Sequence, residues 1–76
     1  MQDNQTNRLR FTTVMDGMAS IYGGVLSKSD MQMRFLCLQE YSLEEIQQAA
    51  TKLIKKREKN FPAVPTVEEM IDAIHI

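Results

Sequence analysis

The chain has 76 residues, with nine Lys and Arg against ten Asp and Glu and a formal net charge of -1 at pH 7. Its hydrophobic fraction of 43% and charged fraction of 25% are those of a globular protein and exclude a polar, disordered chain. We therefore expect one domain over residues 1–76, with residues 1–5 disordered. The near-neutral charge also argues against a dedicated DNA-coating protein, because such proteins carry a basic excess.

A single cysteine, Cys37, and a single histidine, His75, limit the possible chemistry. Cys37 cannot form an internal disulfide, and a zinc site would need carboxylates or a second copy of the chain to complete it. We therefore expect no cofactor and no metal. Cys37 lies among apolar residues and is expected to be buried, whereas His75 has no nucleophile motif around it. The polar first residues and the lack of a long apolar run predict a cytoplasmic protein without membrane contact.

Apolar residues at helical spacing predict a first helix near residues 6–22. Thr6 or Asn4 can cap its start, and Gly17 inside it can mark a close helix–helix approach. The pair Gly23-Gly24 is expected to end it, since either residue can adopt the left-handed conformation. The predicted core stripe consists of Phe11, Val14, Met15, Met18, Tyr22 and Val25.

A second helix is expected near residues 29–40. Ser29 and Gln32 are spaced as a capping box, and Ser27 with Asp30 offers an alternative frame. Its core stripe consists of Met31, Phe35 and Leu38, widened by Met33, Leu36 and Cys37. A helix this broadly apolar is expected to be central and to contact its neighbours on more than one side.

Two further helices are expected near residues 43–59 and 67–74. Capping boxes beginning at Ser42 and at Thr66 mark their starts, and the segment 61–65, with its two prolines, separates them. Their core stripes consist of Leu43, Ile46, Ala50, Leu53 and Ile54, and of Val67, Met70, Ile71 and Ile74. Four helices with short connections predict an all-α fold, a compact four-helix single domain.

No catalytic residue is expected, and the chain is predicted not to be an enzyme. The pairs Glu44-Glu45 and Glu68-Glu69 occupy positions where capping boxes place Glu, which explains them without acid–base chemistry. Gly23-Gly24 lacks the following Lys and Ser or Thr of a phosphate-binding loop.

Lys52, Lys55, Lys56 and Lys59 follow helical spacing and share one face of the third helix. One interpretation is a solvated helix end, where positive charge suits the helix dipole. The other is a patch for an acidic protein or a phosphate backbone, without base-specific readout. Met33, where exposed, suits an adaptable binding surface. The candidate partner-binding residues are therefore these four lysines and Met33.

Two longer motifs resemble a known family. Residues 38–45 read L-x-x-Y-S-x-E-E, and residues 59–66 read K-x-F-P-x-x-P-T. Together with Phe11, Met15 and the segment 21–27, their order and separation resemble the small helical domain of bacteriophage replicative-helicase loader and inhibitor proteins. The resemblance extends from about Arg10 to Ile74 and rests on caps, turns and core positions.

This resemblance implies a phage or prophage replication accessory protein without catalytic activity. Its expected partner is a replicative helicase or an initiator, bound by protein–protein contact. Two alternatives stay open. One is a stand-alone small phage inhibitor of a host defence complex, a task for which phages use short helical proteins. The other is a weak nucleic-acid-binding module that uses the lysines.

Overall fold

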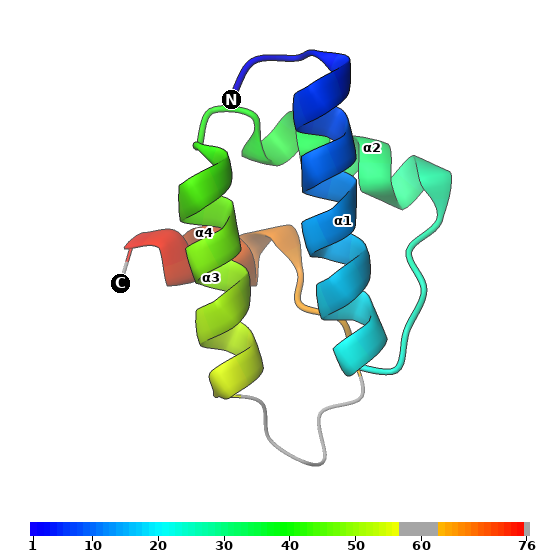
Figure 1. Ribbon diagram of the computed structural model, residues 1–76. Helices are drawn as coiled ribbons and strands as arrows, with labels where there is room; N and C mark the ends of the chain where they lie inside the picture. The colour runs from blue at the N-terminus through cyan, green and yellow to red at the C-terminus, as the bar shows by residue number, and fades with distance from the viewer. Residues whose placement is uncertain (57–62, 76) are drawn as a thin grey trace.

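The computed structural model describes residues 1–56 and 63–75, which form four α-helices (Figure 1). These are α1 (Gln5–Ile21), α2 (Lys28–Leu38), α3 (Leu43–Lys55) and α4 (Val67–His75). The all-α fold predicted from the four apolar stripes is confirmed. The third helix is shorter than predicted, because Lys56 forms its C-cap and already lies in a turn. Residues 57–59 of the predicted helix lie outside the described residues.

Side-chain caps determine where the first two helices begin. Asn4, one of the two predicted caps, has extended backbone and accepts a hydrogen bond from a first-turn amide of α1. In α2 the Ser27 Oγ accepts from the amide of Asp30 at 3.1 Å. The predicted capping box of Ser29 and Gln32 is therefore wrong, and the alternative frame is used. The reason is that Ser27 has the extended backbone of a cap, whereas Ser29 is already helical.

Both later helices begin with the predicted capping boxes. In α3 the Glu45 amide donates to Ser42 Oγ, and the Ser42 amide donates to Glu45 Oε1, each at 3.1 Å. At the start of α4 the Glu69 amide donates to Thr66 Oγ1 at 3.1 Å, and the Thr66 amide donates to Glu69 Oε1 at 3.2 Å. Each box satisfies two amides that the helix itself leaves without a partner.

Specific contacts hold residues 1–4, although the sequence predicts disorder over residues 1–5. The N-terminal ammonium of Met1 donates to the carbonyl oxygen of Gln39 at 2.8 Å, and Gln39 is the C-cap of α2. Asp3 forms an ion pair with Arg8. The first residues are thereby fastened to the end of α2 and to the start of α1.

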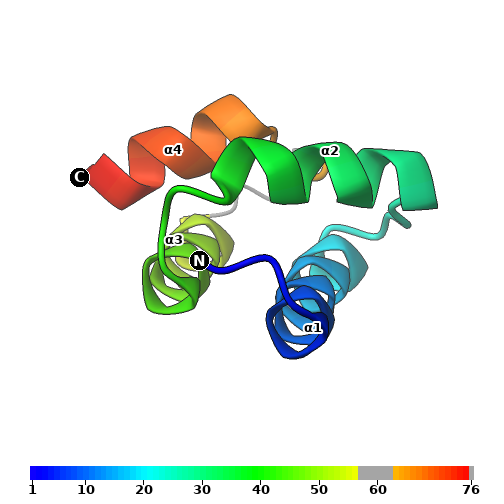
Figure 2. The same cartoon turned by 90° about the horizontal axis from the view of Figure 1, so that it is seen from above.

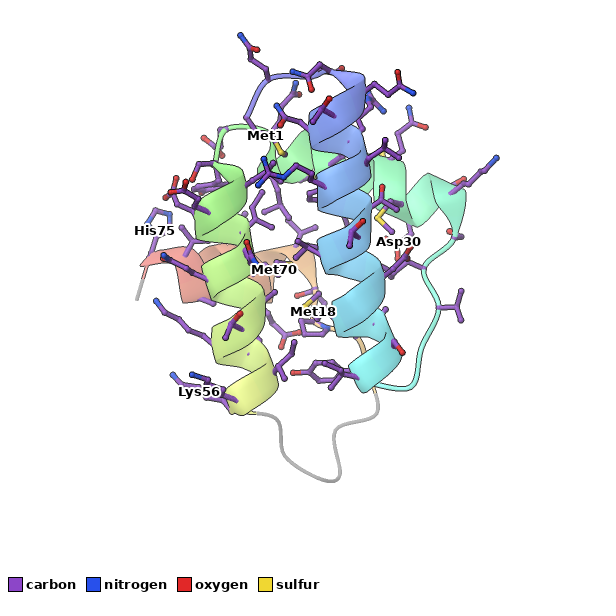
Figure 3. The ribbon with its side chains drawn as sticks, viewed as in Figure 1. Met1, Met18, Asp30, Lys56, Met70 and His75 are labelled. Carbon is purple, nitrogen blue, oxygen red and sulfur yellow. The ribbon has the colours of Figure 1, made fainter. Side chains whose placement is uncertain are left out.

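The four helices form two layers. In Figures 1 and 2, α1 and α3 run side by side in the same direction, and α2 and α4 cross behind them. Helix α3 contacts both α1 and α4, and α2 contacts both α1 and α4. The core fills the space between the layers, where α1 contributes Phe11, Met15 and Met18, and α4 contributes Met70 (Figure 3).

The ends of α1 and α3 are joined by Tyr22, whose hydroxyl donates to the carbonyl oxygen of Leu53 at 3.0 Å. Tyr22 is buried as its stripe predicts. Val25, assigned to the same stripe, is 94% exposed. This assignment is wrong because α1 ends at Ile21, so helical spacing no longer determines which way Val25 points.

Glycines after α1 take two different roles. Gly23 has a φ of 76°, in the left-handed region, as predicted for the residue that ends a helix. Gly24 lies against the connection into α4, where a Cβ added to it would come within 2.8 Å of Val64 Cγ2. Val64 is half-buried and packs on the core. The close approach therefore occurs at Gly24. The predicted approach at Gly17 is wrong, because an added Cβ there meets no described atom within 4 Å.

Gly17→Ala is expected to raise the free energy of unfolding by about 0.5–1 kcal/mol, because alanine loses less backbone entropy than glycine when the helix forms. The added Cβ meets open space, so it causes no clash. Gly24→Ala is the matched control and is expected to lower the free energy of unfolding by about 1 kcal/mol, because the new Cβ crowds Val64. Urea denaturation of both variants measures the difference. Equal effects at the two positions would contradict this assignment of the close approach.

Candidate functional site

Three of the predicted lysines are exposed on the last turns of α3. Lys52, Lys55 and Lys56, which we call the lysine face, are all exposed, and Figure 3 shows Lys56 at the end of α3. Lys59 lies outside the described residues. The lysine face is outward because Ile46, Ala49 and Ala50 are buried on the opposite side of the same helix.

Helix α4 places acidic side chains beside these lysines. A recess of about 220 Å³ between α3 and α4 is lined by Lys52, Leu53, Lys56, Glu69, Asp72 and Ala73. The Lys52 Nζ donates to the carbonyl oxygen of Ala73 at 3.4 Å, which is a long hydrogen bond across the two helices. The surface around the recess therefore carries charges of both signs and has a small apolar floor.

Sequence reasoning missed Glu69 and Asp72 as members of this surface. The apolar stripe of α4 indicates which of its residues point inward, but it does not say which helix lies next to its polar side. Glu69 also fills the capping position, and this role fully explained its presence. The proximity of acids and lysines thus depends on the packing of α4 on α3.

A second candidate surface lies on the outward side of α2. Met33 is 58% exposed and Leu36 is 50% exposed, and Cys37 beside them is exposed as well. The prediction of a buried Cys37 is wrong, and so is that of a central α2, although α2 does contact two neighbours, α1 and α4. Helix α2 instead lies at the edge of its layer and packs through Phe35 and Leu38, so its wider apolar face meets solvent.

The inward side of α2 carries a buried arginine that the sequence did not single out. Arg34 is 7% exposed, and its Nη1 donates to the carbonyl oxygen of Pro65 at 2.6 Å. Its Nε donates to Asp30 Oδ1 at 3.2 Å. The bond to Pro65 connects α2 to the residue that precedes the cap of α4, and the bond to Asp30, within α2, holds the guanidinium in place. Arg34 therefore positions α4 and with it one wall of the recess.

A groove of about 420 Å³ separates the first half of α1 from the start of α2. Its apolar lining includes Phe11 and Phe35, and the Arg8 guanidinium lies 4.7 Å from the centre of the Phe35 ring. The same guanidinium donates to the carboxylate of Asp3 and holds the pKa of that carboxyl below its usual value. Arg8 is thus engaged within the chain, which reduces its use for binding.

Tyr41 and His75 form a contact between the start of α3 and the end of α4. The Tyr41 hydroxyl lies 3.3 Å from His75 Nε2, and the two rings meet edge to face at 5.8 Å. Desolvation, followed by the charges of Glu40 and Glu45, raises the pKa of the Tyr41 hydroxyl, so it stays protonated at neutral pH. The His75 side chain therefore contacts Tyr41 and connects the end of α4 to the start of α3.

The described ranges 1–56 and 63–75 show neither a metal-binding cluster nor a membrane-spanning helix. Within them, His, Cys, Asp and Glu do not gather in threes that could hold a metal ion. Helices long and apolar enough to cross a membrane are likewise absent from these ranges. Comparison of the chain with protein-family models, with curated proteins and with solved structures gave no match.

Proposed function

We propose that the chain is a non-enzymatic accessory protein of phage or prophage DNA replication that acts by protein–protein contact. The proposed partner is a replicative helicase or an initiator, as the resemblance of residues 38–45 and 59–66 to helicase loader and inhibitor proteins implies. The proposed contact surface is the lysine face together with the recess between α3 and α4. One observation carries the choice of surface, namely exposed Lys52 and Lys56 around a recess that also holds Glu69 and Asp72.

This surface suits a protein partner better than a nucleic acid. A phosphate backbone is uniformly negative, so the carboxylates of Glu69 and Asp72, which line the same recess as the lysines, would repel it. A protein can place acidic groups against the lysines and a basic group against the two carboxylates. Such a match of both signs speeds association and rejects wrong partners. The recess can accept one side chain, in the manner of an interface anchor.

Reversing Lys55 and Lys56 to Glu is expected to slow association with the partner about tenfold at low salt, because clustered charges steer encounter. Both side chains are exposed, so the helical circular dichroism spectrum is expected to stay unchanged. The partner is first identified by pull-down from host lysate with mass spectrometry. The rates are then measured by surface plasmon resonance with the purified helicase or initiator at two salt concentrations.

The matched control is the double variant Arg10→Glu and Lys28→Glu. It changes the net charge of the chain by the same amount as the Lys55 and Lys56 variant, but at positions on α1 and α2. It is expected to associate almost as fast as the original chain. Equal slowing by both double variants would show that net charge alone matters and would remove the lysine face from the proposal. Unchanged binding by the Lys55 and Lys56 variant would do the same.

The two alternatives are outcomes of the same experiments. Recovery of a host defence complex in the pull-down, with direct binding of its purified components, would favour the inhibitor interpretation. Binding to a 20-base-pair duplex with a steep dependence of affinity on salt would favour the nucleic-acid module.

A further inference from the structure

We propose that Asp72 is the specificity-determining residue of the recess between α3 and α4, where its carboxylate keeps polyanions such as nucleic acids off the lysine face. The inference rests on the proposed function, because it concerns the same surface. Asp72 is exposed and lines the recess from α4, whereas Lys52 and Lys56 line it from α3. One wall of the recess is therefore acidic and the other is basic.

The second acid of the recess, Glu69, is committed to the fold. Its Oε1 accepts hydrogen bonds from the amide and from the Oγ1 of Thr66, each at 3.2 Å. These bonds turn the Glu69 carboxylate towards the start of α4, and its side chain is half-buried. Asp72 is exposed and lies in the second half of α4, away from that cap. Its charge is therefore the one that an approaching partner meets.

The two walls are close enough to act on a ligand together. The recess has a volume of only about 220 Å³, so the charges around it lie within one Debye length, about 10 Å at 0.1 M salt. The Asp72 carboxylate thus lowers the positive potential that Lys52 and Lys56 present to a phosphate backbone. A protein can place a basic group against Asp72 and still use the attraction of the lysines. Asp72 therefore separates the two classes of partner.

Fluorescence anisotropy with a labelled 20-base-pair duplex tests the proposal. At about 50 mM salt, Asp72→Asn is expected to bind the duplex about threefold more tightly than the original chain, and Asp72→Lys about tenfold more tightly. The gain is expected to shrink at about 200 mM salt, because it comes from charge. Asp72 is exposed, so the helical circular dichroism spectra of both variants are expected to match that of the original chain.

Asp16→Lys is the matched control. Asp16 is an exposed aspartate on α1 that lines the groove towards α2, so the variant makes the same change in net charge away from the recess. It is expected to change duplex affinity by less than about twofold. A second control places Asp72→Asn in the Lys55→Glu and Lys56→Glu background. There the gain is expected to disappear, because the lysine face no longer attracts phosphate.

The duplex measurements need no protein partner, so they test Asp72 separately from the proposed function. Failure of the proposed function would appear instead as unchanged binding of the Lys55 and Lys56 variant to the purified helicase or initiator. Equal gains for Asp16→Lys and Asp72→Lys would overturn the role of Asp72. So would an original chain that already binds the duplex as tightly as its Asp72→Lys variant, or a gain from Asp72→Asn that persists without the lysines.

Discussion

Phe11→Ala is expected to lower the free energy of unfolding by about 4 kcal/mol. The Phe11 side chain is 1% exposed, and its ring meets the Phe35 ring edge to face with the ring centres 5.3 Å apart. Truncation removes this aromatic contact and leaves a cavity between α1 and α2, where the layers meet. A domain of this size has a total stability of only about 5–10 kcal/mol, so the variant is expected to be close to unfolded at 37 °C.

Leu9→Ala is the matched control for this prediction. Leu9 lies on the same helix but is largely exposed, so its loss is expected to change the free energy of unfolding by no more than about 0.5 kcal/mol. Urea denaturation followed by circular dichroism measures both variants. A loss below 1 kcal/mol for Phe11→Ala would mean that the core of α1 and α2 is packed more loosely than the buried fractions indicate.

The parts of the fold that the sequence predicted depend on neighbouring residues. The boxes at Ser42 and Thr66 were predicted because both partners in each box lie within one helical turn. The turn residue Gly23 was predicted for the same reason, since only its own backbone conformation is involved. Helical spacing also placed Lys52, Lys55 and Lys56 on one outward face, as the structure has them.

The parts that the sequence did not predict depend on which elements meet. In α2, apolar residues occupy three sides, so periodicity alone could not tell that Phe35 points inward while Met33 and Cys37 point outward. The recess between α3 and α4 follows from the same packing, which brings Asp72 near Lys56.

Arg34→Ala is the second change with a large expected effect, and it is expected to lower the free energy of unfolding by about 3 kcal/mol. Arg34 was missed in the sequence because its main partner, the carbonyl oxygen of Pro65, is 31 residues away. Removing the guanidinium leaves that buried carbonyl without its donor and empties the space that the side chain fills. Because Pro65 precedes the cap of α4, amide hydrogen exchange in α4 is expected to accelerate more than in α1.

Asp30→Asn separates the two bonds of Arg34. It weakens only the bond to Asp30, whose side chain is 46% exposed, and it keeps the bond to Pro65. The expected loss is below about 1 kcal/mol, since exposed ion pairs contribute little. Equal losses for Arg34→Ala and Asp30→Asn would show that the contact with Pro65 adds nothing to stability. A larger loss for Arg34→Ala, with faster exchange confined to α4, would establish Arg34 as the residue that holds α4, and with it Glu69 and Asp72, in place beside the lysine face.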